Sequence, residues 1–169
     1  YVELQKLGLV EAGYESTLDI TSCPGTDTCN LGIASSTGVS AALESVLKNE
    51  FPQYANNKEI TIKISGCMNS CGQHSMAHIG FQGMTIKSGK LVAPALQVLL
   101  GGGIVGNGAG RIAKKVIKIP SKRGPEALRT ILNNYQENVI VGESFLHYYD
   151  RQGEIYFYNL LKPLIDTTN

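Results

Sequence analysis

The chain reads Ile60-Thr-Ile-Lys-Ile-Ser-Gly-Cys-Met-Asn-Ser-Cys-Gly72 near its centre. Isoleucine alternates with threonine and lysine over residues 60–64, which predicts a half-buried β-strand. Cys67 and Cys71 follow directly, among glycines and small polar residues that let backbone N–H groups turn toward sulfur and stabilise a thiolate. We therefore expect this strand to deliver two thiolates into a tight turn.

A second cysteine pair lies upstream, in Thr21-Ser-Cys-Pro-Gly-Thr-Asp-Thr-Cys29, and the chain has four cysteines in all. Four thiolates are what a cubane iron–sulfur cluster requires, one for each iron. Structural zinc is an alternative, although the gap between Cys23 and Cys29 exceeds the usual spacing of about two to four residues. Buried, inert thiols are another. A disulfide framework is the last, but so few cysteines fit a reducing compartment better.

Both segments resemble one family, the sirohaem-containing nitrite and sulfite reductases. In that family a Cys-x5-Cys pair and a Gly-Cys-x-Asn-x-Cys-Gly segment hold a 4Fe–4S cluster, and the last cysteine bridges the cluster to the sirohaem iron. Residues 66–72 match the second segment, with Met68 where the family usually has proline. The likeness extends from Tyr1 to Leu132 and includes Leu99-Leu-Gly-Gly-Gly103.

The resemblance implies roles for five residues of these segments. Cys23, Cys29, Cys67 and Cys71 would ligate the cluster. Cys71 would also be the bridging thiolate, and so the catalytic residue, while Asn69 would contact the sirohaem side of the site. The implied reaction is the six-electron reduction of sulfite to sulfide or of nitrite to ammonia. A ferredoxin or a flavoprotein would supply the electrons.

The arginines limit what this chain does alone. It has four, and none precedes Arg111. Sirohaem carries a ring of carboxylates, and burying carboxylates requires partners such as bidentate guanidinium groups. By resemblance, those cations come mainly from an amino-terminal half, so we expect the carboxy-terminal part of an enzyme, inactive alone and partnered by that missing half. The alternative is a stand-alone Fe–S electron-transfer or redox-sensing module without haem.

The composition and net charge of the chain exclude few other classes of function. The chain has 169 residues, 43% of them hydrophobic, and a formal net charge of +1. No apolar run is long enough for a membrane span, and no leader is visible, so we expect a cytoplasmic protein with no membrane partner. Six cations and no acid lie between Arg111 and Arg123. Such a run meets cofactor carboxylates, an acidic protein or water. Nucleic acid is disfavoured because no aromatic residues interleave with these cations.

The pattern predicts an α/β (α+β) fold, with a mixed sheet and flanking helices. We expect a cluster- and sirohaem-binding half domain over residues 1–92, a ferredoxin-like half domain over 93–160, and a tail over 161–169. The predicted helices start at the chain's first residues and at residues 37–40 and 126, ending near residues 12, 50 and 135; residues 145–149 are a further candidate. The predicted strands are residues 18–21, 60–64, 77–81, 84–87, 97–100, 116–120 and 155–158.

Two further features carry weaker expectations. Residues 101–110 form a glycine-rich loop, which we interpret as a close approach to a flat cofactor or as a flexible surface loop. His74 and His78 lie four apart, the spacing that places two imidazoles on one helix face, where they could bind a metal. A turn drifting into a strand is the favoured interpretation there, because Gly72 and Gly80 bracket the pair.

Overall fold

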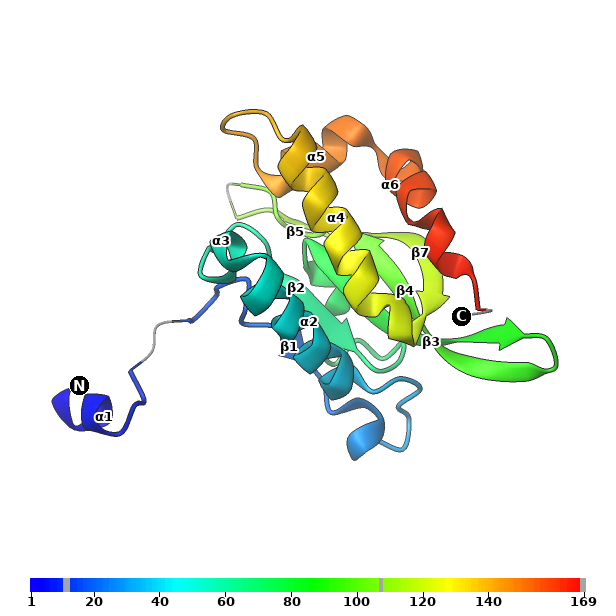
Figure 1. The fold of residues 1–169 in the computed structure, drawn as a ribbon, viewed down its shortest axis with the longest axis horizontal. Helices are drawn as coiled ribbons and strands as arrows, with labels where there is room; N and C mark the ends of the chain where they lie inside the picture. The colour runs from blue at the N-terminus through cyan, green and yellow to red at the C-terminus, as the bar shows by residue number, and fades with distance from the viewer. Residues whose placement is uncertain (11–12, 107, 168–169) are drawn as a thin grey trace.

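A five-stranded mixed sheet forms the centre of the molecule (Figure 1). The structure, a computed structural model, describes residues 1–10, 13–106 and 108–167. The strand order is β1-β2-β3-β4-β7, in which β1, β2 and β3 run parallel and β3, β4 and β7 run antiparallel. The strands are β1 (Thr21–Ser22), β2 (Ile62–Ser65), β3 (Ile79–Ser88), β4 (Leu91–Leu100) and β7 (Lys114–Pro120). The predicted mixed sheet with flanking helices is confirmed.

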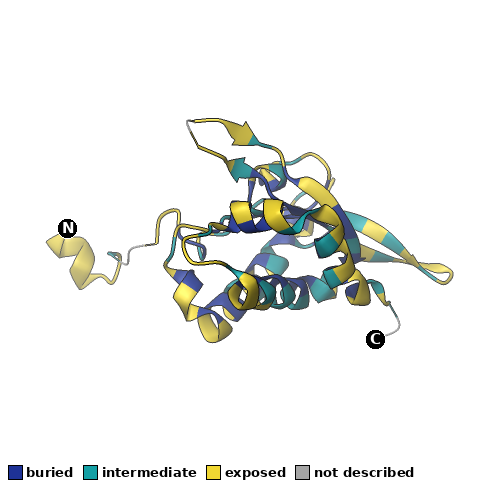
Figure 2. Ribbon diagram, turned by 90° about the horizontal axis from the view of Figure 1, so that it is seen from above, coloured by how far each residue is buried: buried dark blue, intermediate teal, exposed yellow. Residues whose placement is uncertain are grey.

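Two long helices cover one face of this sheet (Figure 1). Helix α2 (Ser36–Glu50) begins at Ser35, whose hydroxyl accepts the Gly38 N–H at 3.2 Å. Helix α4 (Gly124–Asn138) has proline in its first turn, where no N–H is needed. Figure 2 shows the buried residues gathered between the helices and the sheet. The fully buried members include Leu43, Leu47, Ile62, Ile64, Ile79, Phe81, Leu96, Leu128 and Ile131.

Shorter elements complete the chain. The short helices are α1 (Val2–Lys6), α3 (Pro52–Ala55), α5 (Phe145–Gln152) and α6 (Glu154–Leu161). The 3-10 turns are η1 (Gly25–Asp27), η2 (His74–Met76), η3 (Ser121–Arg123) and η4 (Lys162–Ile165). A separate two-stranded ribbon joins β5 (Gly103–Ile104) to β6 (Gly110–Arg111). Figure 2 shows this ribbon projecting on the side of the sheet away from the long helices. None of the described helices is long and apolar enough to cross a membrane.

Several predicted boundaries are wrong. Residues 155–158 lie in α6, because Phe157 and Leu161 are one helical turn apart and both are fully buried. Strand β3 continues through Gly83, so the two short strands predicted there are one, and with β4 it forms the long hairpin at the right of Figure 1. Helix α1 ends at Lys6, whereas the predicted end at residues 11–12 lies outside the described residues.

Some expectations concern residues that the structure does not describe, or remain untested. Residue 107 of the glycine-rich loop and residues 168–169 of the tail lie outside the described part. The proposed division between residues 92 and 93 falls inside β4, and the sheet continues across it. That division therefore stays a prediction.

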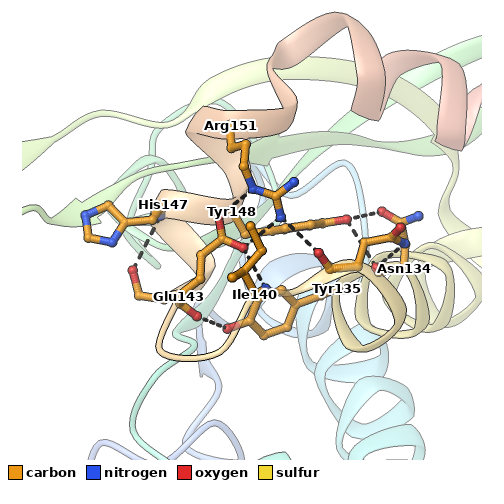
Figure 3. Close-up of polar contacts among 9 residues, drawn as sticks. Asn134, Tyr135, Ile140, Glu143, His147, Tyr148 and Arg151 are labelled. Atoms are coloured by element: carbon orange, nitrogen blue, oxygen red, sulfur yellow. Dashed lines mark hydrogen bonds and ion pairs between the residues drawn. The ribbon is translucent and has the colours of Figure 1, made fainter.

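Helices α4 and α5 meet in a dense polar and aromatic corner (Figure 3). Arg151 makes a bidentate ion pair with Glu143, at 2.7 Å for both bonds, and donates to the Asn138 carbonyl at 2.9 Å. The guanidinium also lies over the Tyr148 ring, 5.3 Å from its centroid. The Tyr148 hydroxyl donates to Asn134, whose side chain in turn contacts another tyrosine. These contacts between protein groups hold α5 against α4 without the help of a ligand.

Candidate iron–sulfur site

The two cysteine pairs leave the sheet at the same edge. Strands β1 and β2 are parallel neighbours, with Thr21 opposite Lys63 and Ser22 opposite Ile64. Because the carboxyl ends of parallel strands meet at one edge, Cys23 and Cys67 emerge side by side. The predicted turn after each strand is present, and the 3-10 turn η1 lies between Cys23 and Cys29.

Main-chain hydrogen bonds join the two cysteine segments. The Gly66 N–H donates to Cys23 Sγ at 3.1 Å, and the Cys23 N–H donates to the Ile64 carbonyl at 3.2 Å. Beyond Cys29, the Ile33 and Ala34 N–H groups both donate to the Gly66 carbonyl, at 2.8 and 3.1 Å. The loop that carries the first pair therefore wraps around the residue that precedes the second pair.

Two glycines make this close approach possible. A Cβ atom at Gly66 would lie 2.7 Å from the Gly25 Cα, a separation that real side chains do not reach. A Cβ at Gly72 would overlap the Ile64 carbonyl and lie 3.2 Å from the Cys23 nitrogen. Any side chain at either position would push the cysteine segments apart.

Cys23 lies in surroundings that favour a thiolate. The Ser36 hydroxyl is 3.4 Å from its sulfur and donates to its carbonyl at 2.7 Å. Ser36 is also the first residue of α2, so the positive end of a fifteen-residue helix lies beside this segment. Burial acts to raise the pKa of the Cys23 thiol, but hydrogen bonds, foremost those from Gly66 and Ser36, outweigh it and leave the pKa below its ordinary value.

The four cysteines differ in exposure. Cys67 is buried, Cys23 and Cys29 are half-buried, and Cys71 is exposed. All four are free thiols, so no disulfide links them. The set thus consists of three partly or fully covered sulfur positions and one that faces outward.

The backbone on both sides of Cys71 is left-handed. Ser70 has φ of 61° and Gln73 has φ of 56°, although neither is glycine. A non-glycine residue in this region costs about 1–2 kcal/mol, and such strain concentrates at functional sites. Asn69, the predicted sirohaem contact, is exposed in the turn between Cys67 and Cys71.

A cavity of about 710 Å³ opens on the sheet face opposite α2, beside the segment that follows Cys71. Gln73 lines it and accepts a hydrogen bond from the Lys63 ammonium at 2.9 Å. The β5–β6 ribbon supplies another wall through Ile104 and Arg111. The cavity therefore combines apolar, cationic and acidic groups near the exposed cysteine, the acids being Glu15 and Asp19.

The two histidines of this region play separate roles. His74 is buried in η2, and burial, opposed by a hydrogen bond to Gln82 and reinforced by the charge of Lys115, lowers its pKa. His78 lies at the cavity wall, where its Nδ1 accepts the Thr61 N–H at 2.8 Å. Within the described residues, no three His, Cys, Asp or Glu side chains are grouped to hold a single metal ion.

That finding bears on the choice between zinc and a cluster. Four ligands of one zinc ion crowd around a single point, at about 2.3 Å for sulfur. Thiolates of a cubane bind four different iron atoms and need no such crowding. One structural zinc would require a tighter grouping of ligands than the described residues show, whereas a cubane does not require it.

The arginines, by contrast, are already engaged within the chain. Each of the four makes an ion pair of 2.6–2.8 Å with a carboxylate. The pairs are Arg111–Asp150, Arg123–Glu126, Arg129–Glu50 and Arg151–Glu143. Each guanidinium is therefore already paired with one carboxylate, although Arg111, which lines the cavity, retains an Nη2 without a hydrogen-bond partner.

Sequence reasoning missed several features of this site. Nothing in the pattern identified Ser36 as a partner of Cys23, because thirteen residues separate them and only the fold brings them together. The left-handed Ser70 and Gln73 also carried no signal, since that conformation is usually marked by glycine or asparagine. The sequence indicates Gly66 and Gly72 only as residues that let N–H groups turn toward sulfur. It does not indicate that the backbones of the two segments make close contact at these glycines.

Comparison with known proteins identifies the family. The family model of the nitrite and sulphite reductase 4Fe–4S domain matches residues 13–162. The chain is 30% identical to the sulfite reductase [NADPH] hemoprotein beta-component of Staphylococcus carnosus, over 89% of this chain and 26% of that protein. It is 24% identical to the assimilatory ferredoxin-dependent nitrite reductase of Haloferax mediterranei, over 78% of this chain and 22% of that protein.

Solved structures agree with this result. The Mycobacterium tuberculosis NirA protein superposes with a TM-score of 0.73 at 26% identity, covering 92% of this chain and 29% of that one. Dissimilatory sulfite reductase I has a TM-score of 0.63 at 9% identity, covering 89% of this chain and 54% of that one, and shares the fold. The chain spans about a quarter of the length of the curated relatives.

Proposed function

Because the chain belongs to the nitrite and sulphite reductase 4Fe–4S domain family, we propose that it is the cluster-binding part of a sirohaem-containing nitrite or sulfite reductase. Cys23, Cys29, Cys67 and Cys71 hold the 4Fe–4S cluster in this proposal. Cys71 also bridges to the sirohaem iron, where sulfite or nitrite is reduced by six electrons. The two metal groups supply the redox chemistry when bound.

The observation that carries the bridging role is the exposure of Cys71. A thiolate shared by two metal groups must be reachable from outside the cluster pocket, and Cys71 alone of the four cysteines is exposed. The left-handed Ser70 and Gln73 fix the loop that presents it. At Cys23, the Gly66 N–H donates to the sulfur and stabilises its negative charge.

The chain's own residues fit a cluster well but fit sirohaem only in part. The cavity beside Gln73 offers lysines and apolar side chains. However, the carboxylates of sirohaem require several cationic partners, and every arginine of the chain already has one carboxylate. We propose that the missing cations belong to other parts of a longer polypeptide, and that this chain alone does not reduce sulfite or nitrite.

The paired arginines also favour a second candidate, a haem-free electron-transfer or redox-sensing module. Visible absorption of the protein purified from its own host separates the two, because sirohaem adds intense bands that a bare cluster lacks. Sirohaem bands support the reductase. A cluster spectrum without them supports the module.

The bridging role is tested by two serine substitutions in the complete reductase. Cys71→Ser should lower activity per assembled cluster more than Cys23→Ser does, because in this proposal Cys71 serves two metal groups and Cys23 serves one. Iron, acid-labile sulfide and the sirohaem spectrum are measured on both variants. Equal loss per cluster with unchanged sirohaem bands would overturn the bridging role.

A further inference from the structure

A buried hydroxyl lies between the two cysteine segments. It belongs to Ser36, the first residue of α2, which is fully buried. The hydroxyl donates to the Cys23 carbonyl at 2.7 Å and lies 3.4 Å from Cys23 Sγ. A Cβ at Gly25 would overlap its oxygen, and a Cβ at Gly66 would lie 3.4 Å from it. Backbone from both cysteine segments therefore closes around this hydroxyl and keeps water away from it.

The Ser36 hydroxyl has one proton and two acceptors within reach. A hydroxyl donates once, so it can serve the Cys23 carbonyl or the Cys23 sulfur, but not both fully. While Cys23 is a thiol, its S–H can donate to the hydroxyl oxygen, which leaves the serine proton for the carbonyl. A metal-bound thiolate has no proton, and its negative charge makes it a stronger acceptor. Rotation about the Cβ–Oγ bond then moves the serine proton from the carbonyl to the sulfur.

The surroundings of this hydroxyl make its hydrogen bond sensitive to charge. Hydrogen bonds in a buried region of low dielectric are stronger than those in water. The Gly66 N–H also donates to Cys23 Sγ, at 3.1 Å, but this amide is fixed in the backbone. The Ser36 hydroxyl can rotate, so it is the donor that responds when the charge on the sulfur changes.

We propose that Ser36 is a positioning residue of the cluster, whose hydroxyl donates to Cys23 Sγ in the reduced state and raises the reduction potential. This inference rests on the proposed function, because it needs a cluster ligated by Cys23. A one-electron reductant adds one negative charge, which the cluster and its thiolates share, and no bond is made or broken. A donor that binds more strongly as this charge grows stabilises the reduced form more than the oxidised form.

A purely structural role is the simpler explanation for a buried serine. The hydroxyl joins the Cys23 carbonyl to the first turn of α2, and that bond alone would hold the loop in place. On this explanation, removing the hydroxyl lowers stability and the yield of cluster but leaves the reduction potential of assembled clusters unchanged. The explanation does not require the sulfur to lie within hydrogen-bond distance of the same oxygen. The reduction potential therefore separates the two roles.

The test compares Ser36→Ala with Ser40→Ala in the chain with reconstituted cluster. Ser40 is a matched control, because it is a buried serine one turn further along α2 and its hydroxyl donates to Glu44 at 3.5 Å. Spectroelectrochemical titration measures the reduction potential, and iron and acid-labile sulfide are counted per chain. We expect Ser36→Ala to lower the equilibrium constant for one-electron reduction by about tenfold, which is about 59 mV, and Ser40→Ala to change it by less than about twofold.

Ser36→Thr and Ser36→Val separate the hydroxyl from the shape of the side chain. Threonine and valine have nearly the same shape, but only threonine can donate to the sulfur. We expect the threonine variant to have the higher potential, by about tenfold in the same equilibrium constant. Because both members carry the same added bulk, this pair decides the question if Ser36→Ala fails to fold or to assemble a cluster.

Two results would overturn the role of the Ser36 hydroxyl and leave the proposed function intact. One is an equal potential for wild type and Ser36→Ala at equal iron content, whatever the loss of stability. The other is an equal potential for the threonine and valine variants. A wild-type chain that assembles no cluster would overturn the proposed function, and this inference with it.

Discussion

The cysteine end and the α4–α5 corner of this molecule are held together in opposite ways. At the cysteine end, backbone packs on backbone through Gly66 and Gly72, and two residues are strained. At the corner, aromatic side chains and a bidentate ion pair fill the space, and Tyr148 is fully buried (Figure 3). The difference teaches that the first end depends on close backbone approach beside strained residues, whereas the second depends on the packing and pairing of side chains.

The sharpest way to break the comparison is to place a methyl group between the cysteine segments. Gly72→Ala forces a Cβ against the Ile64 carbonyl, so we expect a loss of about 3 kcal/mol in unfolding free energy and failure to assemble the cluster. Urea unfolding and iron analysis measure both.

Gly89 provides a control at which backbone strain acts without close packing. Unlike Gly72, it is left-handed, with φ of 61°, and a Cβ there would meet no atom within 4 Å. Gly89→Ala should therefore cost about 1 kcal/mol from backbone strain alone, with full cluster content. Equal costs at the two glycines would show that the close packing around Gly72 is not essential.

Removing iron should affect only one of the two regions. After chelation, amide hydrogen exchange in residues 23–36 and 65–76 should accelerate by at least about tenfold, because a ligand stabilises the segments that it holds. Exchange in α4 and α5 should change by less than about twofold, since no proposed ligand lies there. Comparable acceleration in both regions would mean that the corner also depends on the cluster.

Tyr148→Phe tests the corner without touching the cysteines. It removes the hydroxyl that donates to Asn134 and deprives the Asn134 side-chain oxygen of that donor, whereas the Asn134 carbonyl still accepts from Asn138 Nδ2 at 2.9 Å. We expect a loss of about 1–2 kcal/mol in unfolding free energy, measured by urea titration, with unchanged iron content. A fall in iron content would contradict the independence of the two regions.

Acidification gives the smallest expected effect, through Glu143. The hydrogen bond and charge of Arg151 lower the pKa of this carboxyl to about 2, below its ordinary value near 4.5. Because the folded-state pKa is depressed, the stabilisation is complete above about pH 4.5 and is lost as the pH falls toward 2.

Glu143→Gln should make that dependence shallower. Urea midpoints at pH 5 and pH 3 measure it, with wild type losing more stability between the two than the variant. Glu137→Gln is the control on the neighbouring helix α4, since Glu137 is exposed and no salt bridge among the described residues engages it. Parallel pH dependences for wild type and Glu143→Gln would contradict the role assigned to this carboxyl.

Hydrophobic periodicity predicted the elements whose apolar residues all face one core. The strand at residues 60–64 and the helices ending near residue 50 and beginning near residue 125 were recognised, because their apolar residues face a single core. The strand prediction for residues 155–158 is wrong because Ile-Tyr-Phe-Tyr has strand composition and the short helix α6 offers little periodicity.

For the site, the sequence proposes residues but no geometry. Cysteine spacing and the flanking glycines select the four thiols as the proposed ligands. Spacing carries no information on which thiol faces outward, so the exposure of Cys71 and the left-handed Ser70 and Gln73 appeared only in the structure. The same holds for the contact of Ser75 with Ala113, which depends on strand pairing far along the chain.

The two-residue strand β1 has a consequence for the order of folding. Its pairing joins Thr21 to Lys63 across a long intervening segment, so closing it costs more chain entropy than forming the β3–β4 hairpin. Cys23 and Cys29 lie on the late-closing side, whereas Cys67 and Cys71 lie on the side that β3 already holds. Bound iron and sulfide would thus link the two cysteine pairs across the β1–β2 pairing, which is the last contact of the sheet to form. An iron-starved cell would accumulate a chain with two of its thiols in position and the other two untethered.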